Sequence, residues 1–99
     1  MCESLKTVIN NLESKSSRQY LTSIEIGMLS ITYPREQSYD LVGLVQVEVA
    51  RLGLRLEFMK VDPRGVRYDL HMQVKGELTV VDTLFDTVLA TDNVVLMEV

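Results

Sequence analysis

Cysteine, histidine and tryptophan are nearly missing from this chain of 99 residues, which contains one cysteine, one histidine and no tryptophan. The single cysteine, Cys2, has no partner for an internal disulfide, so we expect a protein of the reducing cytoplasm. One histidine and one cysteine are also too few for a Cys/His zinc site. We therefore expect no bound metal.

The chain also lacks a basic excess, a phosphate-binding loop and a long apolar run. Ten Lys and Arg residues against fourteen Asp and Glu residues give a net charge of −4, which argues against nucleic acid as a partner because phosphate binding needs clustered cations. No GxGxxG or GxxxxGK(S/T) sequence is present, and no apolar run approaches the roughly 18 residues of a membrane span. The composition, 46% hydrophobic and 24% charged, is that of one globular domain, for which we expect no cofactor.

The first residues resemble an appendage to the main domain. A helix between Glu3 and Lys15 would carry four apolar side chains on one face: Leu5, Val8, Ile9 and Leu12. The polar sequence SKSSRQ follows as a linker. We assign residues 1–19 to this helix and linker, and residues 20–99 to the domain.

The stretch from Tyr20 to Tyr33 predicts one strand, which Pro34 ends because proline has no backbone donor. Its apolar residues change from one face to the other near Gly27. A glycine at this point permits a bulge or a close approach of another backbone, and a central strand that is buried on both faces is the alternative.

The segment from Ser38 to Leu52 has helical spacing, although three of its valines also alternate as in a strand: Val45, Val47 and Val49. A helix is favoured because Ser38 can cap its start and Gly53 its end. A second helix is predicted by the apolar stripe from Leu78 to Leu89, with a capping box that begins at Thr79. The final strand is predicted at Val94–Val99.

Between the two helices, Leu54–Val61 and Val66–Lys75 predict the strands of a hairpin. The turn sequence DPRG predicts a three-residue loop from Pro63 to Gly65. That loop sets a register with three apolar pairs on one face: Phe58 with Leu70, Leu56 with Met72, and Leu54 with Val74.

The polar residues from Arg67 to Lys75 then face away from the core, with His71 opposite Glu57. Such pairs are typical of a solvated sheet face. Catalysis at His71 would need a nucleophile or carboxylate that the sequence does not specify, so we expect no catalytic residue and no enzyme. Met59 and Val61 join the same outward row and predict a contact surface.

The order β–α–β–β–α–β predicts an α+β, ferredoxin-like sandwich with a four-stranded antiparallel sheet and two helices on one face. The expected order across the sheet is fourth, first, third and second strand. The two outer strands are then uncovered edges, so we expect the domain to form a homodimer. The residues predicted for its interface are Met59, Val61 and Leu96.

The sequences VEVARLGLRLEFMKVDPRGVRYDLHMQVKG and LTVVDTLFDTVLATDNVVLMEV resemble ACT domains, the small ligand-sensing modules of metabolic enzymes and regulators. In layout the chain is most similar to the cytosolic C-terminal domain of MgtC/SapB-type membrane proteins. The resemblance implies a noncatalytic regulatory or interaction domain. Its partner would be a second copy, or the membrane-embedded portion of a longer chain of which it forms a part.

ACT domains also contact an amino-acid effector at a glycine-containing turn after their first strand. The corresponding sequence here is YPREQSYD, which lacks that glycine. The resemblance implies that an effector would contact Tyr33, Arg35, Ser38 and Asp40. The alternative function is therefore a sensor of an amino-acid-like small molecule.

Overall fold

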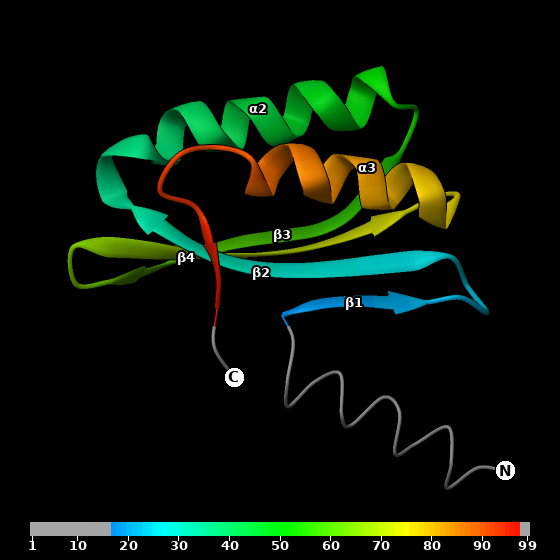
Figure 1. Cartoon of the computed structure of the whole chain (residues 1–99), viewed down its shortest axis with the longest axis horizontal. Helices are drawn as coiled ribbons and strands as arrows, with labels where there is room; N and C mark the ends of the chain where they lie inside the picture. Colours follow the sequence, from blue (N-terminus) through cyan, green and yellow to red (C-terminus); the bar gives the residue numbers. More distant parts are fainter. Residues whose placement is uncertain (1–16, 98–99) are drawn as a thin grey trace, which may run out of the picture.

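The structure, a computed structural model, describes residues 17–97, which form a five-stranded antiparallel sheet with two helices on one face (Figure 1). The predicted α+β class is confirmed. In chain order the elements are β1 (Arg18–Leu21), β2 (Ile26–Pro34), the 3-10 helix η1 (Arg35–Gln37), α2 (Ser38–Arg51), β3 (Arg55–Arg64), β4 (Arg67–Lys75), α3 (Leu78–Leu89) and β5 (Val95–Leu96). The helix predicted at residues 3–15 lies outside the described residues.

The stretch predicted as one strand is a hairpin, so the sheet has five strands and not the predicted four. β1 and β2 are joined by a turn at residues 22–25, in which Glu25 has a φ of 52°. β1 pairs with the first half of β2, and β5 pairs with Ile31 and Thr32 farther along β2. β4 lies between β2 and β3 and pairs with both. The turn sequence TSIE contains no glycine, proline or asparagine, so the strand pattern continues through it without a break.

The helix α3 packs directly on β2 at Gly27. A β-carbon added to Gly27 would overlap Val81 and lie 3.0 Å from Phe85 Cε2, so the missing side chain is what lets the helix approach the strand. The register of β2 runs without a shift along both β1 and β4. The predicted bulge at Gly27 is therefore not observed, and the atoms that approach this glycine belong to side chains of α3, not to another backbone as predicted.

The β3–β4 hairpin differs from its predicted register. Its loop has two residues, Gly65 and Val66, and Gly65 has a φ of 65°. Pro63 remains in β3, an outermost strand, where a missing donor is tolerated. A bulge interrupts β3 between Leu56 and Phe58. The observed apolar pairs are Leu56 with Val74, Met59 with Met72, and Val61 with Leu70.

The bulge reverses the faces predicted for the rest of β3. Met59 and Val61 pack against the core, whereas Phe58 pairs with Gln73 and is 47% exposed. The predicted outward row of Met59 and Val61 was therefore wrong. It assumed continuous alternation along β3, while the extra residue at Glu57 shifts that alternation by one.

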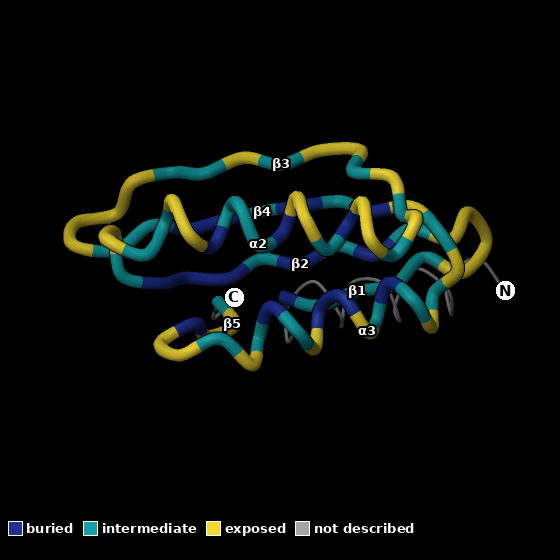
Figure 2. Tube along the Cα trace, turned by 90° about the horizontal axis from the view of Figure 1, so that it is seen from above, coloured by how far each residue is buried: buried dark blue, intermediate teal, exposed yellow. Residues whose placement is uncertain are grey.

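Both helices of the domain are confirmed, although their caps differ from the prediction. α2 begins at Ser38, which directly follows η1 and makes no side-chain cap. At its other end Gly53 has a φ of 70° and follows Leu52, as predicted. α3 is preceded by Glu77, and Thr79 Oγ1 donates to Glu77 Oε1 over 2.8 Å. Figure 2 shows α2 above β4 and β2, and α3 on the side of β1.

The core lies between the sheet and the helices. Alternating residues of β2 and β4 face it from one side, and the inner sides of α2 and α3 face it from the other. The buried residues are Leu29, Ile31, Tyr33, Leu41, Val45, Val49, Leu70, Met72, Val74, Val81, Leu84, Phe85, Val88 and Val94. None of the described helices is both long and apolar enough to span a membrane.

Candidate functional site

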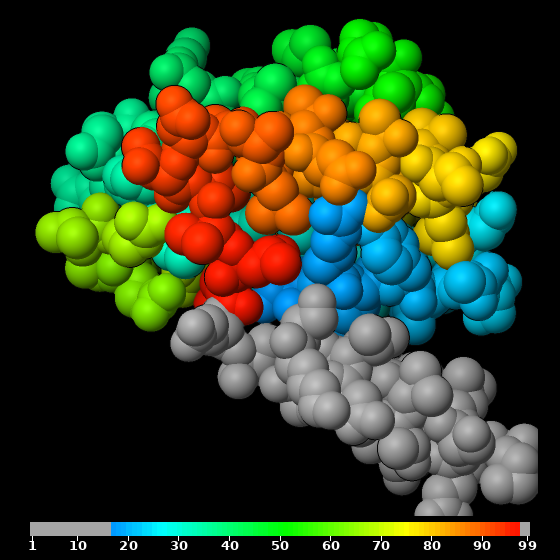
Figure 3. Space-filling view, viewed as in Figure 1, coloured from blue at the N-terminus to red at the C-terminus, as the bar shows by residue number. Residues whose placement is uncertain are grey.

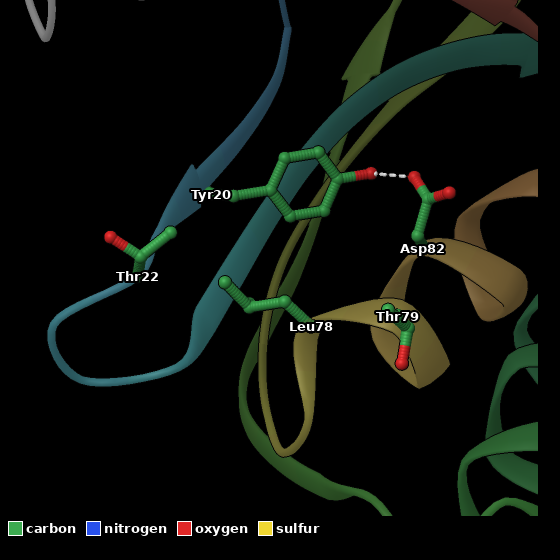
Figure 4. Close-up of a pocket in the computed structure, with 5 residues that line it drawn as sticks. All are labelled: Tyr20, Thr22, Leu78, Thr79 and Asp82. Atoms are coloured by element: carbon green, nitrogen blue, oxygen red, sulfur yellow. Dashed lines mark hydrogen bonds between the residues drawn. The ribbon is translucent and has the colours of Figure 1, made fainter.

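A surface cavity of about 320 Å³ lies where the β1–β2 hairpin meets the start of α3 (Figure 4). Tyr20 and Thr22 line it from the hairpin, and Leu78, Thr79 and Asp82 line it from the first turns of α3. In the space-filling view of Figure 3, β1 in blue lies directly against the orange and yellow surface of α3. The cavity is thus built by two elements that are far apart in the sequence.

A cluster of charged and aromatic side chains lies beside this cavity, and two of its members, Tyr20 and Asp82, line it. Tyr20 OH donates a hydrogen bond to Asp82 Oδ1, and Arg18 Nε donates to Tyr20 OH over 2.6 Å. Arg18 Nη2 donates to Asp82 Oδ1 and, over 2.9 Å, to Asp86 Oδ1. The Arg18 guanidinium also lies 5.8 Å from the centre of the Phe85 ring. These contacts join β1 to α3.

The contacts fix the charge state of the cluster at neutral pH. Burial and the hydrogen bond to Asp82 raise the pKa of Tyr20 to about 12. The hydrogen bonds from Tyr20 and Arg18 lower the pKa of Asp82. Burial opposes the charge of Arg18, but its hydrogen bonds to Tyr20, Asp86 and Asp82 leave its pKa raised. A tyrosine that stays protonated between a cation and an anion is suited to holding β1 and α3 together, and not to transferring a proton.

Sequence reasoning missed this cluster because β1 was not predicted as a separate strand. Arg18 was assigned to the linker and Tyr20 to the start of a long strand. Their spacing of two residues places both side chains on one side of β1, and Asp82 and Asp86 lie one turn apart on α3. These two spacings indicate that each element carries a pair of polar side chains on one side. They do not show that the two elements touch, because that contact depends on the tertiary fold.

The residues predicted to contact an effector occupy different environments. Tyr33 is buried, and its OH lies 2.9 Å from Ser38 Oγ; burial raises the pKa of this tyrosine. Arg35 and Asp40 are exposed on η1 and α2. Ser38 alone of the four lines a described cavity, a hollow of about 410 Å³ on the outer side of α2. The structure brings Tyr33 and Ser38 into contact.

His71 lies on the open face of the sheet, between Ser30 and Lys60 and not opposite Glu57 as predicted. Ser30 Oγ is 2.8 Å from His71 Nδ1, and Asp62 Oδ2 is 3.8 Å from His71 Nε2. A nucleophilic triad would need the aspartate within hydrogen-bond reach of the histidine, and donors free to bind an oxyanion. The amide of Ser30 already donates to a neighbouring carbonyl over 2.7 Å. This geometry fits cross-strand polar packing.

The residues predicted for an interface lie on different surfaces. Met59 and Val61 face the core, as described above, whereas Leu96 is 36% exposed in β5. The edge strand β3 carries a bulge, Lys60 and Pro63. These are features that keep an edge strand from pairing with another chain. Other large apolar side chains are exposed as well, among them Phe58 on β3 and Tyr39 and Val47 on α2.

Within residues 17–97, no group of three or more His, Cys, Asp or Glu side chains is arranged to hold a metal ion. No protein-family profile matches the chain, and no curated protein matches its sequence. The proposals below therefore rest on the geometry of the described residues and on the resemblance in layout.

Proposed function

We propose that this protein is a noncatalytic regulatory or interaction domain that works as a homodimer. The observation that carries the proposal is two large exposed side chains on the outer side of α2: Tyr39 is 87% exposed and Val47 is 62% exposed. A helix on the surface of a domain normally presents charged and polar side chains to water. An exposed apolar patch on such a helix is typical of a contact with another protein.

The strand order supports an ACT-like, ferredoxin-like architecture for this domain. Pairing of β5 with β2, β2 with β4 and β4 with β3 follows the order fourth, first, third and second strand, to which β1 adds a fifth strand. Under this proposal the domain works in the cytoplasm, either on its own or as the C-terminal domain of an MgtC/SapB-type protein. In the second case it would also contact the membrane-embedded portion of its own chain.

Light scattering over a dilution series tests the proposed self-association. A homodimer gives a mass of twice 11.3 kDa at high concentration and dissociates on dilution. A mass that stays at 11.3 kDa at every concentration would remove the proposal.

A second candidate function, sensing of an amino-acid-like effector, is favoured by the cavity beside Tyr20. The Tyr20 ring and Leu78 offer apolar contacts, and the Asp82 carboxylate with the hydroxyls of Thr22 and Thr79 offers polar ones. Such a lining suits a small ligand with an amino group and an apolar side chain. Thermal shift with the twenty amino acids tests this function. Any stabilisation at this cavity should disappear in Leu78→Glu, which adds a charge at the wall and is tolerated at a helix start.

A further inference from the structure

The open face of the sheet carries a pair of charged side chains near the β3–β4 turn. Arg64 Nε donates to both carboxylate oxygens of Asp69, over 3.1 Å to Oδ1 and 2.8 Å to Oδ2. Asp69 is 6% exposed, so a buried carboxylate on β4 holds the arginine of β3 in place. This contact uses Nε alone. Nη1 and Nη2 of Arg64 have no hydrogen-bond partner within residues 17–97.

A cavity of about 350 Å³ lies beside this arginine. Its lining residues come from β2, the end of β3, and β5 with the residue after it: Thr32, Arg64, Val95, Leu96 and Met97. Figure 3 shows the red surface of residues 94–97 beside the yellow-green end of the β3–β4 hairpin. Thr32 Oγ1 accepts from Arg67 Nε over 3.1 Å, which leaves the hydroxyl hydrogen of Thr32 to be donated elsewhere. The cavity therefore offers hydrogen-bond donors on one side and apolar side chains on the other.

The charges around the cavity suit a ligand with one negative charge. Three cations and two carboxylates share this part of the open face: Lys60, Arg64 and Arg67, with Asp62 and Asp69. They leave one positive charge in excess, in a chain whose net charge is −4. A phosphate dianion would be repelled by the two aspartates. A carboxylate matches the excess charge, and its two oxygens fit the planar fork of a guanidinium.

We propose that this cavity binds a small monocarboxylate with a short aliphatic chain. Arg64 Nη1 and Nη2 donate to the carboxylate oxygens of the ligand, and the Thr32 hydroxyl donates to one of them. The aliphatic chain lies along Val95 and Leu96, which are 53% and 36% exposed, and removes their apolar surface from water. Asp69 is a positioning residue, because it holds Arg64 and does not touch the ligand. This inference goes beyond the proposed self-association and does not depend on it.

Titration of the full chain with hexanoate, followed in two-dimensional amide NMR spectra, tests this site. We expect saturable shifts of the signals of Thr32, Val95 and Leu96. Hexanol has the same chain without the charge and should bind at least about tenfold more weakly. Norleucine has the same chain with an added ammonium group, which the nearby Arg67 repels, and should be weaker by a similar factor.

Substitutions in the cavity should remove the binding. Arg64→Gln should weaken hexanoate binding at least about tenfold. Because it also leaves the buried Asp69 without its partner, Val95→Glu provides an independent test: it places a carboxylate on the cavity wall at an exposed position and repels the ligand. Arg55→Gln is the matched control. It removes the same charge at the other end of β3, where Arg55 pairs with Glu57 over 2.8 Å, and should bind hexanoate like the wild type.

The outcomes separate this site from the other proposals. Hexanoate that gives no saturable shifts, or that binds Val95→Glu as tightly as the wild type, would overturn the inference. Shifts centred on Tyr20 and Leu78 would place the ligand in the cavity beside α3 and would overturn it as well. A monomeric wild type that gives the expected shifts would remove the proposed homodimer and support this site.

Discussion

Gly27 of β2 and Val81 of α3 are packed so closely that a β-carbon at the glycine would overlap the valine. This contact also determines where the polar cluster forms. Tyr20 is the cross-strand partner of Gly27, and Asp82 directly follows Val81 in α3. Because the helix rests on the glycine, the Asp82 carboxylate lies close enough to accept the hydrogen bond of Tyr20. The packing of α3 on β2 is therefore linked to the hydrogen bond between Tyr20 and Asp82 at the surface.

The first prediction concerns this packing contact. Gly27→Ala should lower the free energy of unfolding by about 1–3 kcal/mol, because the added methyl group forces α3 away from β2. Val81→Ala alone should also destabilise the protein, since it leaves a cavity. The double variant should lose less than the sum of the two by at least about 0.5 kcal/mol, because the smaller side chain at position 81 makes room for the new methyl group. Urea denaturation measures all three values; strict additivity would contradict the contact.

The second prediction concerns the pH dependence of the stability that the Asp82 carboxylate contributes. Asp82→Asn should lower the free energy of unfolding by about 1 kcal/mol at neutral pH, a modest value because water screens this half-exposed carboxylate. Since folding lowers the pKa of Asp82, the stabilisation is present above the ordinary pKa of 3.8 and is lost as the pH falls through the folded value. The difference between variant and wild type should therefore shrink in urea titrations below about pH 4.

Asp86→Asn is the matched control for this pH experiment. Asp86 lies one turn farther along α3, and its side chain is 67% exposed. It accepts from Arg18, whereas the Tyr20 hydroxyl donates to Asp82, so the replacement of Asp86 should cost less than that of Asp82. If the difference in free energy of unfolding between Asp82→Asn and wild type stays constant down to about pH 2, the contribution of Asp82 does not depend on the charge of its carboxylate.

The third prediction tests the bulge in β3 with one substitution at two adjacent positions. Met59→Thr should cost about 1–2 kcal/mol, because Met59 packs against the core. Phe58→Thr should cost less than about 1 kcal/mol, because Phe58 is on the open face. Threonine suits a strand at both sites, so the difference reports burial. A larger loss at Phe58 would indicate the register without the bulge.

The fourth prediction concerns effector binding. No amino acid should raise the melting temperature strongly, because Tyr33 and Ser38 bond to each other and the Asp82 carboxylate is already held by Tyr20 and Arg18. A ligand at 100 times its dissociation constant would stabilise the protein by about 2.7 kcal/mol, which thermal shift detects easily. A clear hit would favour the sensor function, and its loss in Ser38→Ala or in Leu78→Glu would show which cavity binds.

The sequence predicts the two helices and β4 because their signals are local. The stripe of α3, the glycine after α2 and the alternation from Arg67 to Lys75 each lie within one element. The β1–β2 turn contains no glycine, proline, asparagine or aspartate. The bulge at Glu57 inserts one residue that the apolar and polar pattern of β3 does not reveal. Both were therefore missed, and with them the face of Phe58.

The candidate sites could be predicted less well, because each depends on contacts between elements. Arg18 and Asp82 are 64 residues apart, and no spacing in the sequence indicates that β1 and α3 meet. The outer side of α2 is different, since Tyr39, Gly43 and Val47 lie within one helix. Val47 was instead counted, with Val45 and Val49, as a reason to consider a strand there. An apolar residue that supports a strand pattern in a helix can indicate a second, exposed surface.

Sedimentation equilibrium of the full chain tests the central claim most directly. We expect the wild type to approach twice 11.3 kDa with rising concentration. Val47→Lys should remain a monomer at the same concentrations, because it places a charge on the exposed side of α2 that the proposed contact would bury. The matched control Phe58→Lys, which adds the same charge on the open sheet face, should dimerise like the wild type. A monomeric wild type, or a Val47→Lys variant that dimerises as well as the wild type, would contradict self-association through α2.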